Sequence, residues 1–76
     1  MKGKTMKYMV IIEKDEVGYG AHVPDLPDCI AAGESEEEVR ALIEEAIAFH
    51  IEGLIEEGKR VPQPSSSSIF VEVQAA

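Results

Sequence analysis

Apolar residues alternate with other residues in the first part of the chain and recur every three or four positions further on. The alternation predicts two strands, at residues 7–13 and 19–23, joined by a polar loop that ends in glycine. A short third strand is expected at residues 29–32, and a fourth at residues 69–73 after a stretch rich in proline and serine. With a helix between the last two, the order is βββαβ, an α+β fold.

The helical period predicts one long helix from about residue 36 to about residue 57. Ser35 is suited to cap its first turn, and Glu38 stands three residues later, as in a capping box. Gly58 is suited to end the helix. Apolar residues of this segment share one stripe, which is expected to pack on one face of a three-stranded antiparallel sheet: Val39, Leu42, Ile43, Ala46, Ile47 and Leu54.

The first predicted strand is apolar on both sides, which has a consequence for assembly. Tyr8, Val10 and Ile12 point to one face of the sheet, whereas Met9 and Ile11 point to the other. A single helix covers only one face, so Met9 and Ile11 are expected to lie in a surface that another copy closes. The chain is therefore expected to form a homo-oligomer, a dimer or larger.

A corner is predicted between the second and third strands. Pro24 and Pro27 fix φ twice within four residues, and neither carries an N–H for a strand ladder. We therefore expect a rigid corner that includes Leu26 and leads to Cys29. A single cysteine in such a place is usually a small buried hydrophobe.

Length and charge restrict the function further. Seventy-six residues suit one domain, expected at residues 6–74 after a flexible N-terminal extension at residues 1–5. Seven basic against fifteen acidic side chains give a formal charge of −8, which repels phosphate and argues against direct nucleic-acid binding. No apolar run reaches the roughly 20 residues that a membrane-spanning helix needs. With one cysteine and no secretory core, we expect a cytoplasmic protein.

The histidines, the cysteine and the acids offer little catalytic chemistry. His50 lies on the apolar stripe and is interpreted as a core or interface residue, with a titrating or metal-bound role as the alternative. A catalytic pair of Cys29 and His22 would lack a group to orient the base. Acids on the polar side of the helix are expected to be solvated: Glu44, Glu45, Glu52, Glu56 and Glu57. No catalytic residue, cofactor or metal is therefore expected.

Several motifs together resemble the HicB-type antitoxin family. They are the glycine-aromatic pair Gly18-Tyr19, the corner from Val23 to Cys29, and the helix entry from Gly33 to Glu38. The likeness covers roughly residues 6 to 73. Asp28 departs from the family pattern, which usually has glycine there, so the corner is expected to be slightly strained if this position needs a positive φ.

The resemblance implies a partial ribonuclease-H-like fold that associates into dimers or larger assemblies. It also implies a partner, a small basic HicA-like ribonuclease that cleaves messenger RNA, which the antitoxin would neutralise by covering its active site. Acidic residues in two loops are the expected contact: Glu13, Asp15, Glu16, Asp25 and Asp28. Many relatives continue into a DNA-binding module, whereas this sequence ends at Ala76, so autorepression by this chain alone is not expected.

Two other functions stay open at the level of sequence. One is an orphan oligomeric regulator or small-ligand-binding module. The other is a metal-dependent ribonuclease-H-like nuclease, which would need carboxylates converging from different elements. The first predicted strand has no central acid, which disfavours the nuclease.

Overall fold

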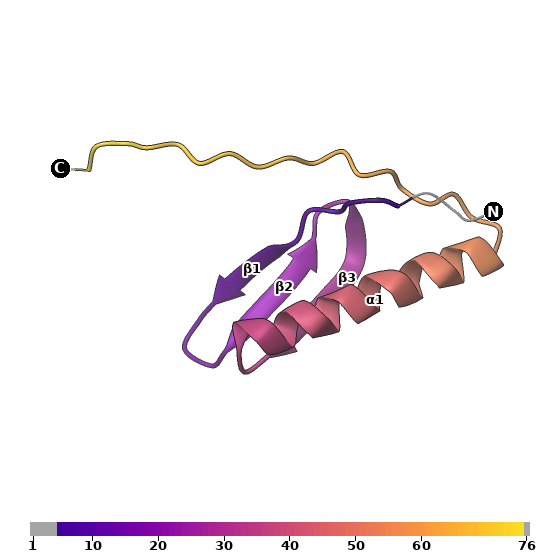
Figure 1. Cartoon of the computed structure of the whole chain (residues 1–76), viewed down its shortest axis with the longest axis horizontal. Coiled ribbons are helices and arrows are strands. Elements are labelled where there is room, and N and C mark those ends of the chain that lie inside the picture. The colour runs from indigo at the N-terminus through magenta and orange to yellow at the C-terminus, as the bar shows by residue number, and fades with distance from the viewer. Residues whose placement is uncertain (1–4, 76) are drawn as a thin grey trace.

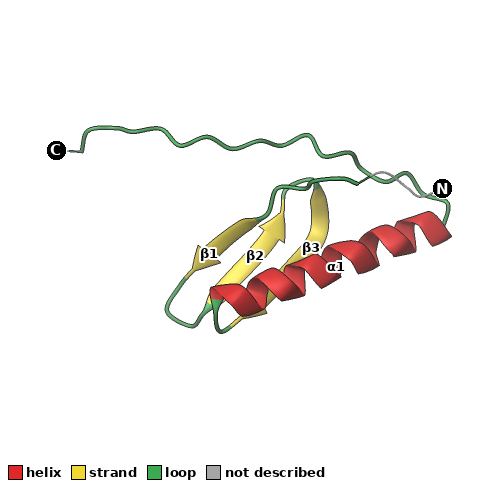
Figure 2. Ribbon diagram, in the orientation of Figure 1, coloured by secondary structure: helices red, strands yellow, loops and turns green. Residues whose placement is uncertain are grey.

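A computed structural model of the chain describes residues 5–75, so the predicted N-terminal extension lies almost wholly outside the described residues. The elements are β1 (Ile11–Lys14), β2 (Tyr19–Val23), β3 (Leu26–Gly33) and α1 (Glu36–Glu56). Figures 1 and 2 show α1 lying across one side of the sheet, and the chain after α1 running back past the sheet and beyond it.

The three strands form an antiparallel sheet in the order β1-β2-β3. Ile11 of β1 lies opposite His22 of β2, and His22 lies opposite Ile30 of β3. The assigned strand β1 is shorter than the expected residues 7–13. Continuing the register from Ile11 would place Met9 opposite Pro24, which has no N–H, so the ladder stops near the start of the turn.

Strand β3 begins three residues earlier than the sequence predicted, because the corner is tighter than expected. Val23 pairs with Leu26 directly across the two turn residues, and the next pair is His22 with Ile30. Residues 27–29 therefore form an irregular bulge without partners on β2. A bulge in an edge strand tolerates Pro27, which has no N–H to donate. No described non-glycine residue has a positive φ, so Asp28 is not strained in that sense.

Helix α1 has well-formed ends. The Ser35 hydroxyl accepts a hydrogen bond from the Glu38 amide at 3.0 Å, and the Glu38 carboxylate accepts one from the Glu34 amide at 2.8 Å. At the other end, Gly58 has φ of 71° and donates to the Ile55 carbonyl, while the Lys59 amide donates to the Leu54 carbonyl. This pair of bonds is a Schellman motif, and it ends the helix at the predicted glycine.

The core lies between α1 and the strands β2 and β3. Its buried members come from the sheet, the corner and the helix: Ala21, Val23, Leu26, Cys29, Val39 and Ile43. Leu42 was expected in this core, and the structure corrects that expectation, because its side chain is 38% exposed. The stripe that packs on the sheet runs through Val39, Ile43 and Ile47, and Leu42 lies on its flank.

The predicted fourth strand at residues 69–73 is absent. These residues are extended but pair with none of the described strands, and Figure 1 shows them as a free segment. A strand needs a neighbouring backbone for its hydrogen bonds, and this segment leaves the body before it meets one. The fold in the described residues is thus a three-stranded antiparallel sheet followed by one helix.

Candidate partner-binding surface

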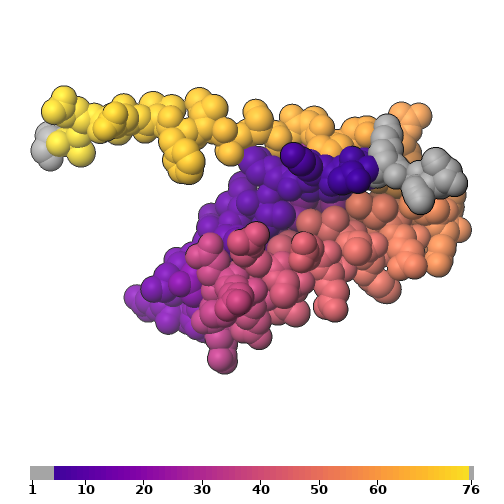
Figure 3. Space-filling model, viewed as in Figure 1, coloured from indigo at the N-terminus to yellow at the C-terminus, as the bar shows by residue number. Residues whose placement is uncertain are grey.

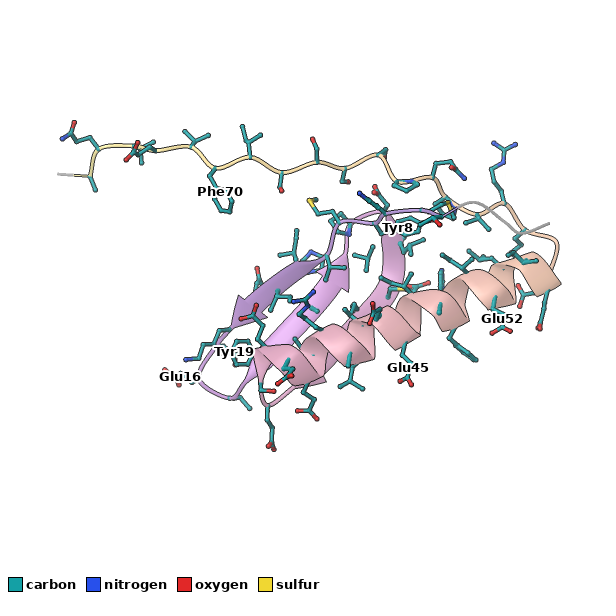
Figure 4. The ribbon with its side chains drawn as sticks, viewed as in Figure 1. Tyr8, Glu16, Tyr19, Glu45, Glu52 and Phe70 are labelled. Carbon is teal, nitrogen blue, oxygen red and sulfur yellow. The ribbon has the colours of Figure 1, made fainter. Side chains whose placement is uncertain are left out.

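The five acids that the sequence suggested as a contact surface do not form one cluster. Glu13 lies in β1, one residue before its end at Lys14, and Glu16 lies in the following loop, at one end of the hairpin, as Figure 4 shows for Glu16. Asp25 lies in the β2–β3 turn at the opposite end of β2, and Asp28 lies in the bulge of β3. The sequence placed them in two loops, and the sheet holds those two loops apart.

Asp15 shapes the β1–β2 loop. Its Oδ1 accepts hydrogen bonds from the amides of Val17 at 2.9 Å and Gly18 at 3.0 Å, and its own amide donates to the Gly18 carbonyl. The Gly18 amide, followed by that of Val17, lowers the pKa of the Asp15 carboxyl. Glu13 and Glu16 are exposed acids on either side of it, so they are better placed to meet a partner.

Asp25 also has a structural task. Its carboxylate accepts hydrogen bonds from the amides of Ser65 and Ser66, at 3.0 and 3.1 Å, and from both serine hydroxyls. The two amides, Ser65 first, lower the pKa of Asp25 to about 2. This clamp could not be predicted from local patterns, because a contact between residues 40 positions apart leaves no local signal.

The face of the sheet away from α1 carries the apolar side chains of Ile11 and Ile30, and none of the described residues forms a helix over it. Ile11, His22 and Ile30 form one row across the three strands of this face. Ile30 is exposed, whereas Ile11 and His22 are half-buried, as is Met9 beside them in the chain. We call Met9, Ile11, His22 and Ile30 the open face.

Cys29 and His22 are kept apart by the sheet. Cys29 is buried in the core, where its thiol lies 3.8 Å from the Ala46 carbonyl and burial raises its pKa. His22 belongs to the open face, so the two do not form a catalytic pair. Within residues 5–75, no group of three or more His, Cys, Asp or Glu side chains is arranged to hold a metal ion.

Two grooves flank α1. One, of about 640 Å³, lies between the chain leading into β1 and the helix, and its apolar lining includes Tyr8, Val10, Ile12, Ile43 and Ile47. The other, of about 440 Å³, lies between β3 and the later part of the helix, and includes His50 and exposed Phe49. His50 is half-buried there, at the edge of the packed stripe.

The outward side of α1 is acidic. Figure 4 shows Glu45 and Glu52 directed away from the sheet, and both are exposed. The first turn of the helix adds three more exposed acids at its positive end, Glu36, Glu37 and Glu38. This charge is spread along the helix and is not gathered into a pocket. No helix formed by the described residues has the length and apolar character to cross a bilayer.

Comparison with known proteins supplies the family. Residues 8–74 match the model of the HicB-like antitoxin of bacterial toxin-antitoxin systems. The chain belongs to the HicB-like antitoxin family. The matched range includes the hairpin, the corner, the helix and the extended segment after it.

Several relatives of this HicB-like chain are known by sequence. It is 43% identical over 66 residues to an uncharacterised 14.9 kDa protein of Haemophilus phage HP1, covering 87% of this chain and 50% of that protein. It is 34% identical over 74 residues to antitoxin HicB 2 of Photorhabdus laumondii, covering 96% and 53%. A UPF0150 protein of Thermoplasma acidophilum is 42% identical over 67 residues, covering 87% and 97%. The chain thus spans about half the length of the first two relatives.

A solved structure agrees with these relationships. A chain of the HicA3 and HicB3 toxin-antitoxin complex superposes with a TM-score of 0.67 and 35% sequence identity, over 79% of this chain and 70% of that chain. The sequence resemblance to HicB-type antitoxins is therefore confirmed, both by the family model and by the fold.

Proposed function

We propose that this HicB-like protein is an antitoxin that binds a small, basic HicA-like ribonuclease and neutralises it by covering its active site. The observation that carries the proposal is the likeness to a chain from the HicA3 and HicB3 toxin-antitoxin complex at 35% identity. The protein has no catalytic role in this scheme: it competes with RNA for the basic surface of the enzyme.

Charge supports the proposal. At a formal charge of −8, the protein attracts a basic partner over several ångströms and speeds their encounter, which is an effect that salt weakens. Carboxylates presented where RNA phosphates would lie also satisfy the same lysine and arginine side chains of the toxin. The acids of this chain are almost all exposed, so they are available for such contacts.

Within this proposal, the hairpin end that carries Glu13 and Glu16 is the first contact to test. Asp25 and Asp28 remain proposed contacts, but the Asp25 carboxylate is already engaged by two serines. Asp15 is a poor target for charge reversal because its carboxylate holds the loop together. Variants at Glu13 and Glu16 therefore separate partner binding from folding.

Calorimetric titration against a basic HicA-like ribonuclease, sought first among the products of genes beside this one, tests the proposal. Wild-type protein should bind, and the affinity should fall as salt rises. The double variant Glu13→Lys and Glu16→Lys should bind more weakly and with a flatter salt dependence of the affinity. Its matched control, Glu45→Lys with Glu52→Lys, changes the charge equally on the outer side of α1. Equal losses in both variants would remove the hairpin from the contact, and no binding by wild type would favour an orphan regulatory module.

We also propose that the open face takes part in self-association. Met9 and Ile11 lie on the side of the sheet that α1 leaves uncovered, and Ile30 extends the apolar surface to β3. Exposed apolar area of this kind favours contact with a second copy. Such burial is important for a domain of this size. A 76-residue chain that folds alone buries a smaller fraction of its surface than a larger domain does, so it gains stability from burying apolar surface against a second copy.

A further inference from the structure

The segment after the helix ends in an exposed apolar arm, residues 67–74, which we call the C-terminal arm. Four of its side chains, Ile69, Phe70, Val71 and Val73, are between 70% and 103% exposed. Figure 3 shows the arm projecting from the body, with no part of the body around its far end. The exposure of four large apolar side chains within five residues to water is unfavourable. We therefore expect another protein surface to bury the arm.

The base of the arm is held in place. The Asp25 carboxylate binds Ser65 and Ser66, and the Tyr8 hydroxyl donates to the Pro62 carbonyl. Pro62 and Pro64 further restrict the backbone between these two contacts. The arm therefore starts from a fixed point and in a fixed direction, and Figure 1 shows it passing beyond the end of β1 without joining the sheet.

The composition of the arm suits a strand. Ile69, Val71 and Val73 are β-branched and point to one side of an extended chain, with Phe70 and Glu72 on the other. Such a segment pairs through its backbone with an open strand edge, while its alternate side chains enter a groove beside that edge. The sheet has two outer edges, on β1 and on β3.

The β1 edge is the better acceptor. Beside it lies the 640 Å³ groove, with Tyr8, Val10 and Ile12 on the sheet side and Ile43 and Ile47 on the helix side. A strand added to β1 would place its β-branched side chains over this groove and complete the cover of α1. The β3 edge carries Pro27 and the bulge of residues 27–29, which interrupt a regular ladder.

We propose that two copies of this chain exchange their C-terminal arms, each arm adding a strand to the β1 edge of the other copy. Each copy carries one arm and one open β1 edge, so a two-fold exchange uses both and leaves neither free. Within the described residues, the arm makes no hydrogen bond to β1 of its own chain. In such a dimer, the arm of each copy forms the predicted fourth strand in the sheet of the other copy.

Intermolecular paramagnetic broadening tests the exchange on the full chain. Unlabelled Gln74→Cys protein, carrying a nitroxide near the end of the arm, is refolded together with ¹⁵N-labelled wild type. Amide signals of residues 7–12 in the labelled copy should broaden. The control is unlabelled wild type put through the same nitroxide reaction, because the native Cys29 is buried and should stay unmodified. A second sample places the nitroxide and the ¹⁵N label on the same chain and dilutes it with unlabelled wild type. Broadening in this second sample alone would overturn the exchange and would mean that the arm folds back onto its own chain.

A pair of arm variants gives a second readout. Val71→Asp should weaken dimerisation by about 10-fold or more, because it replaces an apolar contact with a carboxylate that loses its hydration in the groove, even with Lys7 and Arg40 in the lining. It should leave the body folded, since the Val71 side chain is 70% exposed. Ser67→Asp adds the same charge at the base of the arm and should dimerise like wild type. Equal dimerisation of the two variants in light scattering would contradict the proposal, as would an arm that becomes ordered only when a basic ribonuclease is added.

Discussion

The carboxylate of Asp25 accepts hydrogen bonds from both the amide and the hydroxyl of Ser66, at 3.1 and 2.8 Å, although 41 residues separate them. This contact ties the β2–β3 turn to the chain that leaves α1. It fixes the place from which the C-terminal arm departs, so a turn residue governs the direction of a segment at the other end of the sequence.

Acid should release this clamp. The serine hydrogen bonds lower the pKa of Asp25 to about 2 from an ordinary value of 3.8, so they favour the ionised folded form. The stabilisation is therefore fully present above about pH 4 and is lost as the pH falls toward 2. NMR titration should show the Ser65 and Ser66 amides moving together with an apparent pKa near 2. Asp25→Ala should abolish that titration and speed hydrogen exchange at both serines, whereas Asp28→Ala should not. A midpoint near 3.8 in wild type would contradict the clamp.

Removal of the helix cap should be measurable. Ser35→Ala takes away the acceptor for the Glu38 amide and should lower the free energy of unfolding by about 0.5 to 2 kcal/mol. Urea denaturation at fixed protein concentration measures the loss. Ser67→Ala, in the exposed arm, is the control and should leave the midpoint unchanged. A midpoint for Ser35→Ala equal to that of wild type would mean that the cap contributes nothing.

The two neighbouring helix residues Ile43 and Leu42 should respond differently to truncation. Ile43→Ala should cost about 2 to 5 kcal/mol, because its side chain is buried against the sheet and leaves a cavity. Leu42→Ala should cost clearly less, because Leu42 is already partly in water. Denaturation curves of the two variants compare them directly. A larger loss for Leu42 would place it in an interface or in a core different from the one observed.

A charge on the open face should weaken self-association. Met9→Lys places an ammonium group in the apolar surface beside Ile11 and should shift the protein toward monomer. Light scattering over a range of concentrations measures the shift. Glu45→Gln, which raises the net charge by the same one unit on the exposed outer side of α1, is the control and should leave the mass unchanged. A wild-type protein that is a monodisperse monomer at micromolar concentration would contradict both this prediction and the exchange of arms.

Local patterns predicted much of the fold, because local chemistry decides those elements. Strand β2 and helix α1 lie where alternation and capping residues placed them. The corner was predicted less accurately. The bulge at Pro27 depends on how β3 pairs with β2, and no local sequence pattern indicates that pairing. The segment 69–73 has the composition of a strand, but composition carries no information about which backbone it will meet.

The candidate contact surface was less predictable than the fold. Asp15 and Asp25 were predicted as contacts because they are acidic residues in loops. Both carboxylates instead accept hydrogen bonds from backbone amides of this chain. Such side-chain bonds depend on how the loop closes and on what the distant chain brings to it. Glu13 and Glu16 have the exposure that a docking surface needs, and their charge-reversed variants test that role.

Titration of this protein into an RNA-cleavage reaction of a HicA-like ribonuclease that it binds tests the antitoxin function most directly. Cleavage should fall in proportion to the antitoxin added and stop at a fixed stoichiometric ratio, because an occluded active site cannot bind RNA. Incubation of the antitoxin alone with the same RNA should leave it intact. Undiminished cleavage in the presence of excess antitoxin would contradict the account.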